Sequence, residues 1–468
     1  SLFRTHNWND TLFPLLKNAG YYTGMFGKWH APQNKPEMNA AFDKYTLYSG
    51  FHWSAHFSAW RSTEKKHVTE INRMHAVEFL KNRPKDQKFA LKVSFFATHA
   101  LDNQTPNYQP MNWSRLGYYP DEKSHENYTT FVPPKTATEK HWKELPYFFG
   151  DKNCGRLRWR NRWEPHAWQK NTRDLYAMVT EVDWAIGEIL EVLKQQGVQN
   201  KTLLVFTTDN GEMHGAHGLA GKWYPFEESI RVPLVIQDPR MPPRRHGEFN
   251  TEHTLNVDLA PTLLGAAGLA PSNFMQGRDI ADLYLADNGE HGEHQTSEPK
   301  DERASHKNNN SNTSGEEQQK KWKNNIGRYT SSKNATLPWR KEWFYEWNKG
   351  NPINASGHSE EANIPAVFAL ITPEWKFISW PQKSYEQLYH RSLDPYDEYD
   401  ILQNYYLHHE TLNNNKWVEV TERLRMENFT PSMTTPLGDS IQSTVKIYET
   451  LKARFYELKE QVQSGNKI

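Results

Sequence analysis

One stretch of the sequence decides the fold: Leu203-Leu-Val-Phe-Thr-Thr-Asp-Asn-Gly211. A short apolar run that ends in Asp-Asn-Gly predicts a buried strand followed at once by a turn. Before it, apolar residues from Leu175 to Leu193 recur at helical spacing, and this helix should end at Gly197. A helix that leads into a fully apolar strand is typical of a parallel sheet covered by helices on both faces.

The same alternation of helices and strands extends in both directions from this stretch. It predicts an α/β protein with a large mixed, mostly parallel sheet sandwiched by helices. Residues 100–170 are rich in aromatic residues, proline and histidine, and we expect them to be irregular. The other expected elements are a helix at 11–20, a strand at 21–26, a helix at 64–82, and strands at 88–97 and 232–237, followed by a helix at 255–267.

The C-terminal third has a different character. Residues 286–325 are almost free of apolar side chains and are expected to be a disordered insertion or linker. This segment would separate a catalytic domain, 1–285, from a smaller C-terminal α+β subdomain, 326–468. That subdomain should contain antiparallel strands at 343–347 and within 367–378, and a long terminal helix that packs on its own domain.

Composition excludes several classes of protein. The 468 residues include 56 Lys and Arg and 56 Asp and Glu, so the net charge is zero, which argues against a dedicated nucleic-acid binder. No run approaches the roughly 18 apolar residues of a membrane span. The single cysteine, Cys154, excludes an intrachain disulfide. N-x-[ST] sequons recur along the chain and favour a secreted protein, whose signal peptide would not be part of this chain.

Polar side chains follow three of the predicted strands. Because sites in α/β sheets form at the carboxyl ends of strands, these side chains are expected to share one pocket. Aspartate and asparagine supply the oxygen ligands that Ca²⁺ or Mg²⁺ prefers, lysines stabilise an anionic ester, and a histidine serves as general acid. This set is expected of a sulfate or phosphate ester hydrolase. Its members are Lys28, His30, His99, Asp209, Asn210 and, in a loop before the next strand, Lys222.

Two long motifs carry a resemblance to a known family. The first runs from Thr11 and ends in Gly27-Lys-Trp-His30, and the second opens Phe206-Thr-Thr-Asp-Asn-Gly-Glu-Met-His-Gly-Ala-His-Gly218 and continues to Leu234. Together with Phe95-Phe-Ala-Thr-His99, they resemble the type I, formylglycine-dependent sulfatases of the alkaline-phosphatase superfamily. The resemblance covers most of residues 11–402 and implies an alkaline-phosphatase-like fold.

The resemblance also implies a role for each matching residue. Lys28 and Lys222 would hold the sulfate oxygens, while His30 would hold the hydroxyl of the nucleophile and His99 would protonate the departing alcohol. One calcium ion would be bound by Asp209 and Asn210. Glu227 and Arg231 are expected to form a structural pair that positions the Lys222 loop.

One family signature is not found in the sequence. The family's nucleophile arises from Cys or Ser in Cys/Ser-x-Pro/Ala-x-Arg, and the metal site is completed by an Asp-Asp pair. Cys154 is followed by Gly155-Arg-Leu-Arg158 and does not match. We therefore expect the N-terminal strand and the formylglycine segment to lie outside this chain, which alone would be inactive.

Three functions follow as hypotheses. The first is a sulfatase that acts on a sulfated carbohydrate. The second is a nucleophile-free relative that binds sulfated glycans, with a platform of arginines interleaved with tryptophans. The third is a phosphodiesterase or phosphonate hydrolase of the same superfamily, which Asn210 and Lys222 disfavour. The platform consists of Arg156, Arg158, Arg160 and Arg162, with Trp159, Trp163 and Trp168, and a strand or loop with a solvated basic edge is the alternative for this stretch.

Overall fold

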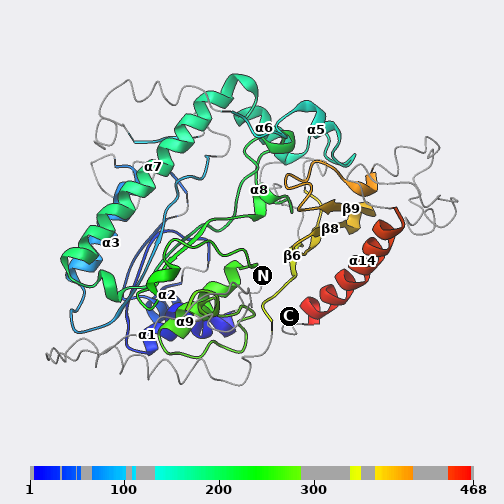
Figure 1. Cartoon of the computed structure of the whole chain (residues 1–468). Coiled ribbons are helices and arrows are strands. Elements are labelled where there is room, and N and C mark those ends of the chain that lie inside the picture. Colours follow the sequence, from blue (N-terminus) through cyan, green and yellow to red (C-terminus); the bar gives the residue numbers. More distant parts are fainter. Residues whose placement is uncertain are drawn as a thin grey trace, which may run out of the picture.

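The fold has two parts, which are joined side by side (Figure 1). The computed structural model describes residues 5–31, 34–48, 50–53, 66–101, 108–111, 132–285, 338–348, 364–403 and 441–464. The predicted linker, 286–325, lies outside the described residues. Within the described part of the chain, no helix is both long and apolar enough to cross a membrane.

A three-stranded parallel sheet forms the base of the N-terminal part. The central strand β1 (Tyr22–Lys28) pairs in parallel with β2 (Lys44–Tyr48) on one side and with β3 (Phe89–Ser94) on the other. Lys28 is in register with Tyr48, and Gly27 with Ser94. The carboxyl ends of all three strands therefore meet at one edge of the sheet.

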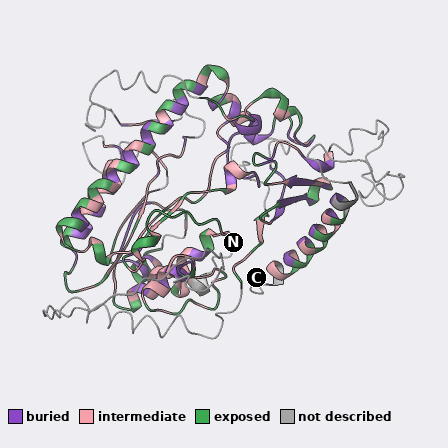
Figure 2. Cartoon of the chain, in the orientation of Figure 1, coloured by how far each residue is buried: buried purple, intermediate pink, exposed green. Residues whose placement is uncertain are grey.

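Helices cover this sheet and bury its apolar side chains. α3 (Val68–Asn82) packs along α7 (Pro165–Gln195), as Figure 1 shows. Phe79 of α3 and Leu193 of α7 share a core with Phe26 of β1. Figure 2 shows a buried stripe along the length of α7. On another side, α1 (Leu12–Asn18) and α2 (Lys35–Ala41) pack against each other.

The apolar run that begins at Leu203 forms β4 (Leu204–Thr207), as predicted. It pairs antiparallel with β5 (Leu234–Gln237) in a separate two-stranded sheet. Leu204 packs in the same core as Leu91 of β3. Among the described strands, however, β3 pairs only with β1 and β4 only with β5. The described strands therefore do not join into the single large sheet that the sequence predicts.

The C-terminal sheet is antiparallel, as predicted. Its four strands lie in the order β6 (Trp343–Trp347), β7 (Val367–Ile371), β8 (Trp375–Trp380) and β9 (Tyr385–His390). The terminal helix α14 (Ile441–Ser464) buries Tyr448, Leu451, Phe455 and Leu458 against this sheet. The fold class is confirmed: a parallel sheet with helices, followed by an antiparallel sheet.

The stretch expected to be irregular contains helices. α5 (Glu139–Lys143) and α6 (Cys154–Arg162) lie within it, and α7 begins ten residues before the first apolar position that predicted it, Leu175. Asn153 caps α6 by accepting a hydrogen bond from the Gly155 N–H. The remaining elements are α8 (Glu227–Ile230), α9 (Leu259–Ala266), α10 (Ala281–Leu285) and the 3₁₀ helices Thr5–Asp10, Gln199–Lys201, Ala216–Gly218, Pro243–Arg245, Asn256–Asp258 and Pro381–Lys383.

A buried ion cluster joins the two parts. The Lys376 ammonium on β8 has no solvent exposure and lies 2.6 Å from Asp397 and 2.9 Å from Glu227. Glu227 begins α8 and also pairs with Arg391 at 3.2 Å. The expected pair of Glu227 with Arg231 is wrong: within the described residues the link between them is a hydrogen bond from the Arg231 N–H to the Glu227 carbonyl.

We predict that Lys376→Ala destabilises the fold by about 3–5 kcal/mol, because it removes the counter-charge of the buried Asp397 carboxylate, while Glu227 keeps its ion pair with Arg391. Lys341→Ala is the matched control: it removes an exposed ion pair with Glu252 at 2.9 Å and should cost under about 1 kcal/mol. The measurement is the free energy of unfolding in urea. Equal losses in the two variants would contradict the structural importance of the cluster.

Candidate active site

Lys28 is the last residue of β1, and the residue before it, Gly27, lies unusually close to the backbone of β3. Gly27 has a φ of +119°, and a Cβ at this position would lie 2.0 Å from the Ser94 carbonyl oxygen of β3. Only glycine permits this backbone path. The Lys28 ammonium lies 5.2 Å from the centre of the Phe96 ring. His30 follows two residues later and is exposed.

His99 lies on the same aromatic ring as Lys28. The Phe96 and His99 rings stack with centroids 5.2 Å apart. The backbone N–H of His99 donates to the backbone carbonyl of Phe96 at 2.8 Å. Phe96 thus brings together Lys28 at the end of one strand and His99 just past the end of its neighbour. This arrangement is the one expected from the carboxyl ends of parallel strands.

Asp209 and Asn210 follow β4 directly. The Gly211 N–H donates to the Ser229 carbonyl at 2.9 Å, which ties this turn to α8. The Asn210 amide nitrogen donates to the Gly211 carbonyl at 2.8 Å, so its side-chain oxygen is left as an acceptor. Desolvation lowers the pKa of Lys92 on β3, and the carboxylate of Asp209 opposes this shift, which places Asp209 near the parallel sheet.

Lys222 lies at the other end of the same loop. We call residues 211–222 the site loop. It closes on itself through hydrogen bonds from the Met213 N–H to the Gly221 carbonyl at 2.9 Å and from the Gly215 N–H to the Leu219 carbonyl at 3.0 Å. Asp209 and Asn210 therefore directly precede the first residue of the site loop, and the half-buried Lys222 is its last residue.

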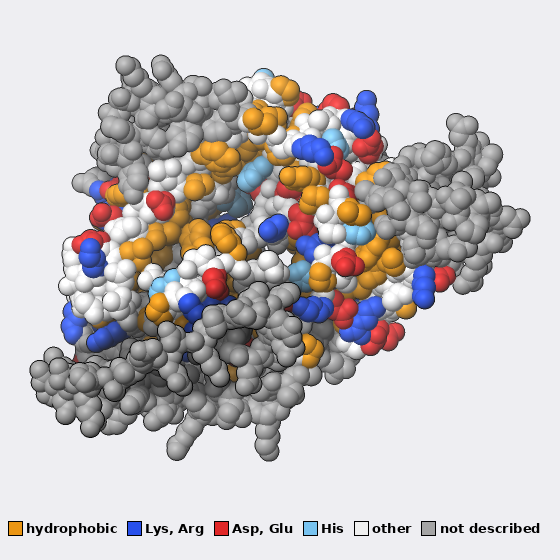
Figure 3. Space-filling view, viewed as in Figure 1, with side chains coloured by type: hydrophobic (Ala, Val, Ile, Leu, Met, Phe, Trp, Pro, Cys, Tyr) orange, Lys and Arg blue, Asp and Glu red, His pale blue; other side chains and the backbone are white. Residues whose placement is uncertain are grey.

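Glu212 is a charged residue of the site loop that lies near His99. It forms ion pairs of 3.5 Å with Arg162 and with His214. Burial alone would raise the Glu212 pKa, but the His214 hydrogen bond and the positive charges of His214, Arg162 and His99 lower it to about 2. An ionised carboxylate thus lies within electrostatic reach of His99. Figure 3 shows a hollow on this face of the molecule, at which histidine and cationic side chains gather.

The four predicted platform arginines do not form one exposed row. They lie on α6, a helix, where residues two positions apart point in nearly opposite directions. Arg156 and Arg162 are buried, and Arg156 stacks 3.9 Å from the centres of both the Trp142 and Trp159 rings. Arg158 lies 4.6 Å from the Trp223 ring, and Arg160 pairs with Asp151. The expectation of a strand or loop here is wrong.

Sequence reasoning missed a buried polar group behind Phe96. His52 stacks on His67 with centroids 5.7 Å apart, and lies 4.8 Å from the Phe96 ring. His67 approaches Glu181 of α7 at 3.6 Å, and burial raises the Glu181 pKa to about 8. No local pattern links these residues, because they come from three distant segments. Glu212 could have been found, since it follows Asp-Asn-Gly directly in the second motif.

The metal-ligand prediction fits the described residues in part. The Asp209 carboxylate and the Asn210 amide oxygen are hard donors suited to Ca²⁺. Calcium takes six to eight oxygen ligands, and within the described ranges no group of three or more His, Cys, Asp or Glu side chains could hold a metal ion. These two residues can form one side of such a site.

Comparison with known proteins identifies the family. The sequence model of one family, described as Sulfatase, matches residues 4–269, more than half of the chain. The chain belongs to the sulfatase family. The family is part of the alkaline-phosphatase superfamily, as the resemblance in the sequence implied.

Individual sulfatases are similar to the chain in sequence. An N-acetylglucosamine-6-O-sulfatase from Bacteroides thetaiotaomicron is 28% identical over 327 residues, which is 59% of this chain and 57% of that protein. An arylsulfatase from Clostridium perfringens is 25% identical over 340 residues, 62% of this chain and 66% of that protein. The chain thus matches less than two thirds of the length of each.

A solved structure confirms the fold. It is described as a complex with its substrate D-glucosamine-2-N,6-O-disulfate, and it superposes with a TM-score of 0.55 at 22% identity. The superposition covers 83% of this chain and 77% of that one. The chain therefore has the fold that the family resemblance implied.

We predict that Gly211→Ala displaces the site loop from α8. A Cβ at this position would lie 2.0 Å from the Glu228 carbonyl oxygen, a backbone atom that cannot move alone. The expected cost is about 1–3 kcal/mol, the usual result of overpacking. The control is Gly187→Ala on α7, where no atom lies within 4 Å of the new Cβ. This control should be stabilising by about 0.5–1 kcal/mol. Urea unfolding measures both, and a stable Gly211→Ala variant would contradict the close approach.

Proposed function

We propose that this sulfatase hydrolyses sulfate esters of a carbohydrate, with its nucleophile supplied by a formylglycine segment that is not part of this chain. One observation supports the proposal: Lys28 and His99, which follow the ends of two neighbouring parallel strands, both lie against the Phe96 ring. Glu212, two residues after Asn210, lies within electrostatic reach of His99. A cationic, proton-donating site of this kind suits the hydrolysis of a sulfate ester, because it stabilises the charge on the sulfate and protonates the departing alcohol.

Each residue has a task that follows from its chemistry. Lys28 and Lys222 hold the sulfate oxygens and stabilise the negative charge that develops on them. His99 donates a proton to the oxygen of the departing alcohol. His30 contacts the hydroxyl of the nucleophile. Asp209 and Asn210 bind a calcium ion, whose charge would hold the sulfate and the nucleophile in place.

The strand pairing supports a contribution from a further segment. Among the described strands, β3 and β4 each have one edge that makes no ladder, although Leu91 and Leu204 share a core. Unpaired edges near a buried core are unfavourable in a finished fold. We propose that a strand carrying the nucleophile and the remaining metal ligands pairs there, and that it completes a catalytic domain formed with residues 1–285.

The substrate class rests on the relatives. The names of two of them refer to sulfated sugars, an N-acetylglucosamine-6-O-sulfatase and a complex with a disulfated glucosamine. We propose the same class, a sulfated carbohydrate, for this protein. The recurrent sequons support a route of this protein through the secretory pathway.

The test is turnover by the full-length product of the gene. We predict that it releases sulfate from glucosamine 6-sulfate in the presence of Ca²⁺, and that a chelator removes this activity. Lys222→Ala and His99→Ala should each lower kcat/KM by on the order of 10²-fold or more. The matched control is Lys194→Ala, whose side chain is 71% exposed at the end of α7 and should leave the rate unchanged.

Three results would count against the proposal. Near-normal turnover in the Lys222→Ala and His99→Ala variants would remove these residues from the site. Faster hydrolysis of a phosphodiester than of a sulfate ester would favour the phosphodiesterase hypothesis. Binding of sulfated glycans without turnover by the full-length protein would favour a non-catalytic relative.

A further inference from the structure

The Phe96 ring lies at the centre of the contacts around the candidate general acid. Phe96 is only 4% exposed, and three charged or titratable side chains surround its ring. The Lys28 ammonium and the His99 ring each lie 5.2 Å from the ring centre, and the His52 ring lies 4.8 Å from it. Phe96 has no charge and no proton to give. A ring that two candidate catalytic groups contact can nevertheless set where both of them lie.

Buried groups hold both the backbone and the ring of Phe96. The Tyr48 hydroxyl, at the end of β2, accepts a hydrogen bond from the Asn72 amide of α3 at 2.6 Å. Burial raises the Tyr48 pKa, and hydrogen bonds from Asn72 and from the Phe96 backbone oppose this rise. A Cβ on Gly50 would lie 3.2 Å from the edge of the Phe96 ring. A buried ring that is packed this closely has little freedom to shift.

His52 supports the Phe96 ring without adding a charge. It has no solvent exposure, and its ring stacks on that of His67 with centroids 5.7 Å apart. Burial lowers the His52 pKa to about 3, with smaller contributions from the positive charges of His67 and His99, so this imidazole is neutral at neutral pH. A protonated imidazole here would repel both Lys28 and a protonated His99. The group behind Phe96 therefore leaves these two cations undisturbed.

The imidazole of His99 is oriented by two contacts. Its Nδ1 lies 2.5 Å from the Ala100 carbonyl oxygen, and because a carbonyl oxygen can only accept, Nδ1 carries a proton and donates it. Nε2 is then the ring nitrogen that passes a proton to a substrate. The stack on Phe96, with 29° between the ring planes, sets the plane in which Nε2 points. The hydrogen bond and the stack together fix the direction of Nε2, which is what a general acid requires.

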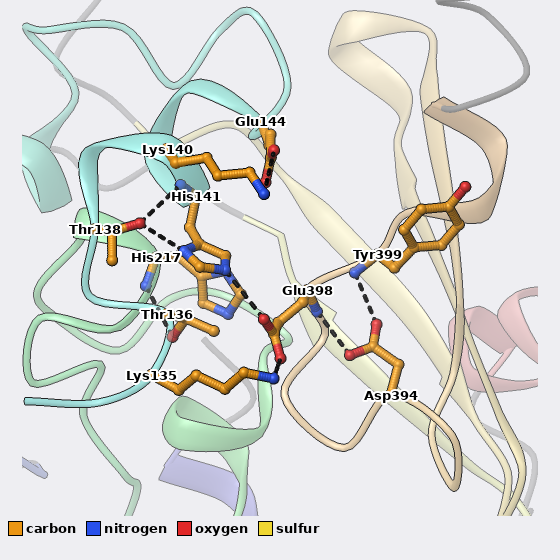
Figure 4. Close-up of polar contacts among 10 residues, drawn as sticks. All are labelled: Lys135, Thr136, Thr138, Lys140, His141, Glu144, His217, Asp394, Glu398 and Tyr399. Atoms are coloured by element: carbon orange, nitrogen blue, oxygen red, sulfur yellow. Dashed lines mark hydrogen bonds and ion pairs between the residues drawn. The ribbon is translucent and has the colours of Figure 1, made fainter. Parts of the chain in front are cut away.

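The site loop, which ends at Lys222, has supports of its own. The Thr136 hydroxyl accepts a hydrogen bond from the His217 N–H of the loop at 3.3 Å. The segment that contains Thr136 also makes two side-chain contacts with Glu398, as Figure 4 shows. These supports come from segments other than those that hold Phe96. A change at Phe96 should therefore act on the two groups that lean on its ring and leave Lys222 in place.

We infer that Phe96 is a positioning residue of this sulfatase: its ring holds His99 in the orientation of a general acid and keeps Lys28 beside it. The inference rests on the proposed function for the roles of His99 and Lys28. The face of an aromatic ring attracts cations. One ring therefore stabilises both the Lys28 ammonium and the protonated His99, which would otherwise repel each other. An aliphatic side chain of similar size would fill the space but would offer neither the cation nor the imidazole an aromatic face.

Removal of the aromatic ring tests the inference. Phe96→Leu keeps an apolar side chain but loses the aromatic face, whereas Phe96→Tyr keeps that face. The matched control is Phe79→Leu, the same change at a residue of α3 that is also 4% exposed and packs on Phe26 of β1. If Phe96→Leu does not fold, Phe96→Met takes its place, because methionine fills a similar volume without a ring. Thermal unfolding shows which variants are folded.

The first measurement needs no turnover and uses the full chain. Histidine labelled with carbon-13 at Cε1 gives one NMR signal for each imidazole, and the His99 signal is the one that His99→Gln removes. The ring current of Phe96 should displace this signal from the position of an exposed histidine such as His30. We expect the displacement to persist in Phe96→Tyr and Phe79→Leu and to disappear in Phe96→Leu. An unchanged His99 signal in folded Phe96→Leu overturns the inference.

The second measurement uses the full-length enzyme and two esters. A sugar alcohol needs a proton in order to depart, whereas 4-nitrophenolate departs without one. Phe96→Leu should therefore lower kcat for glucosamine 6-sulfate by roughly ten- to a hundredfold at a nearly unchanged KM, and should lower kcat for 4-nitrophenyl sulfate much less. Phe96→Tyr should restore most of the rate, and Phe79→Leu should change neither rate.

Equal losses for the two esters in Phe96→Leu, or the same losses in Phe79→Leu, overturn the inference, because both results indicate a merely structural role. A wild-type enzyme that turns over neither ester contradicts the proposed function instead. The NMR result then decides the inference alone, so the two failures are distinguishable.

Discussion

The closed geometry of the site loop is the constraint on which the other features depend. Its first residue, Gly211, is hydrogen-bonded to Ser229 through backbone atoms, and the loop is crossed again by the bond from Met213 to Gly221. Backbone bonds of this kind fix position without relying on side-chain rotamers. The turn at Asp209, the cation at Lys222 and the contact of Glu212 with Arg162 are therefore set by one short segment. A shift of this segment would move all of them together.

The C-terminal sheet acts on the site through α8. Glu227 begins this helix two residues before Ser229, and it is held by the buried Lys376 of β8. A buried ion pair adds little net stability compared with apolar packing, but it has strict requirements on geometry. The cluster of Lys376, Glu227 and Asp397 thus fixes the orientation of α8 on the sheet. In this way, a sheet that contributes none of the predicted site residues helps to position the loop that contributes Lys222.

The sequence predicted elements whose apolar residues repeat with a clear period. The run from Leu203 gave β4, the alternation from Phe89 gave β3, and the helical spacing that begins at Leu175 gave most of α7. It failed for α6, because four of the nine residues of that helix are arginines and it has no apolar stripe. For the site, the approach of Lys28 and His99 to the Phe96 ring could be expected, because both residues follow the ends of neighbouring strands. The partner of Glu227 could not be found, because Lys376 lies 149 positions away and only the packing of β8 against α8 brings it near.

The site loop is held from behind by aromatic packing. The Trp163 ring meets His214 of the loop edge to face at 5.3 Å, and a Cβ on Gly215 would lie 3.1 Å from the Trp168 ring. A displacement of the loop toward these rings would therefore collide with buried, closely packed side chains. Backbone hydrogen bonds hold the ends of the loop and tryptophan packing holds its back, so the Asp209–Asn210 turn and Lys222 keep their relative positions.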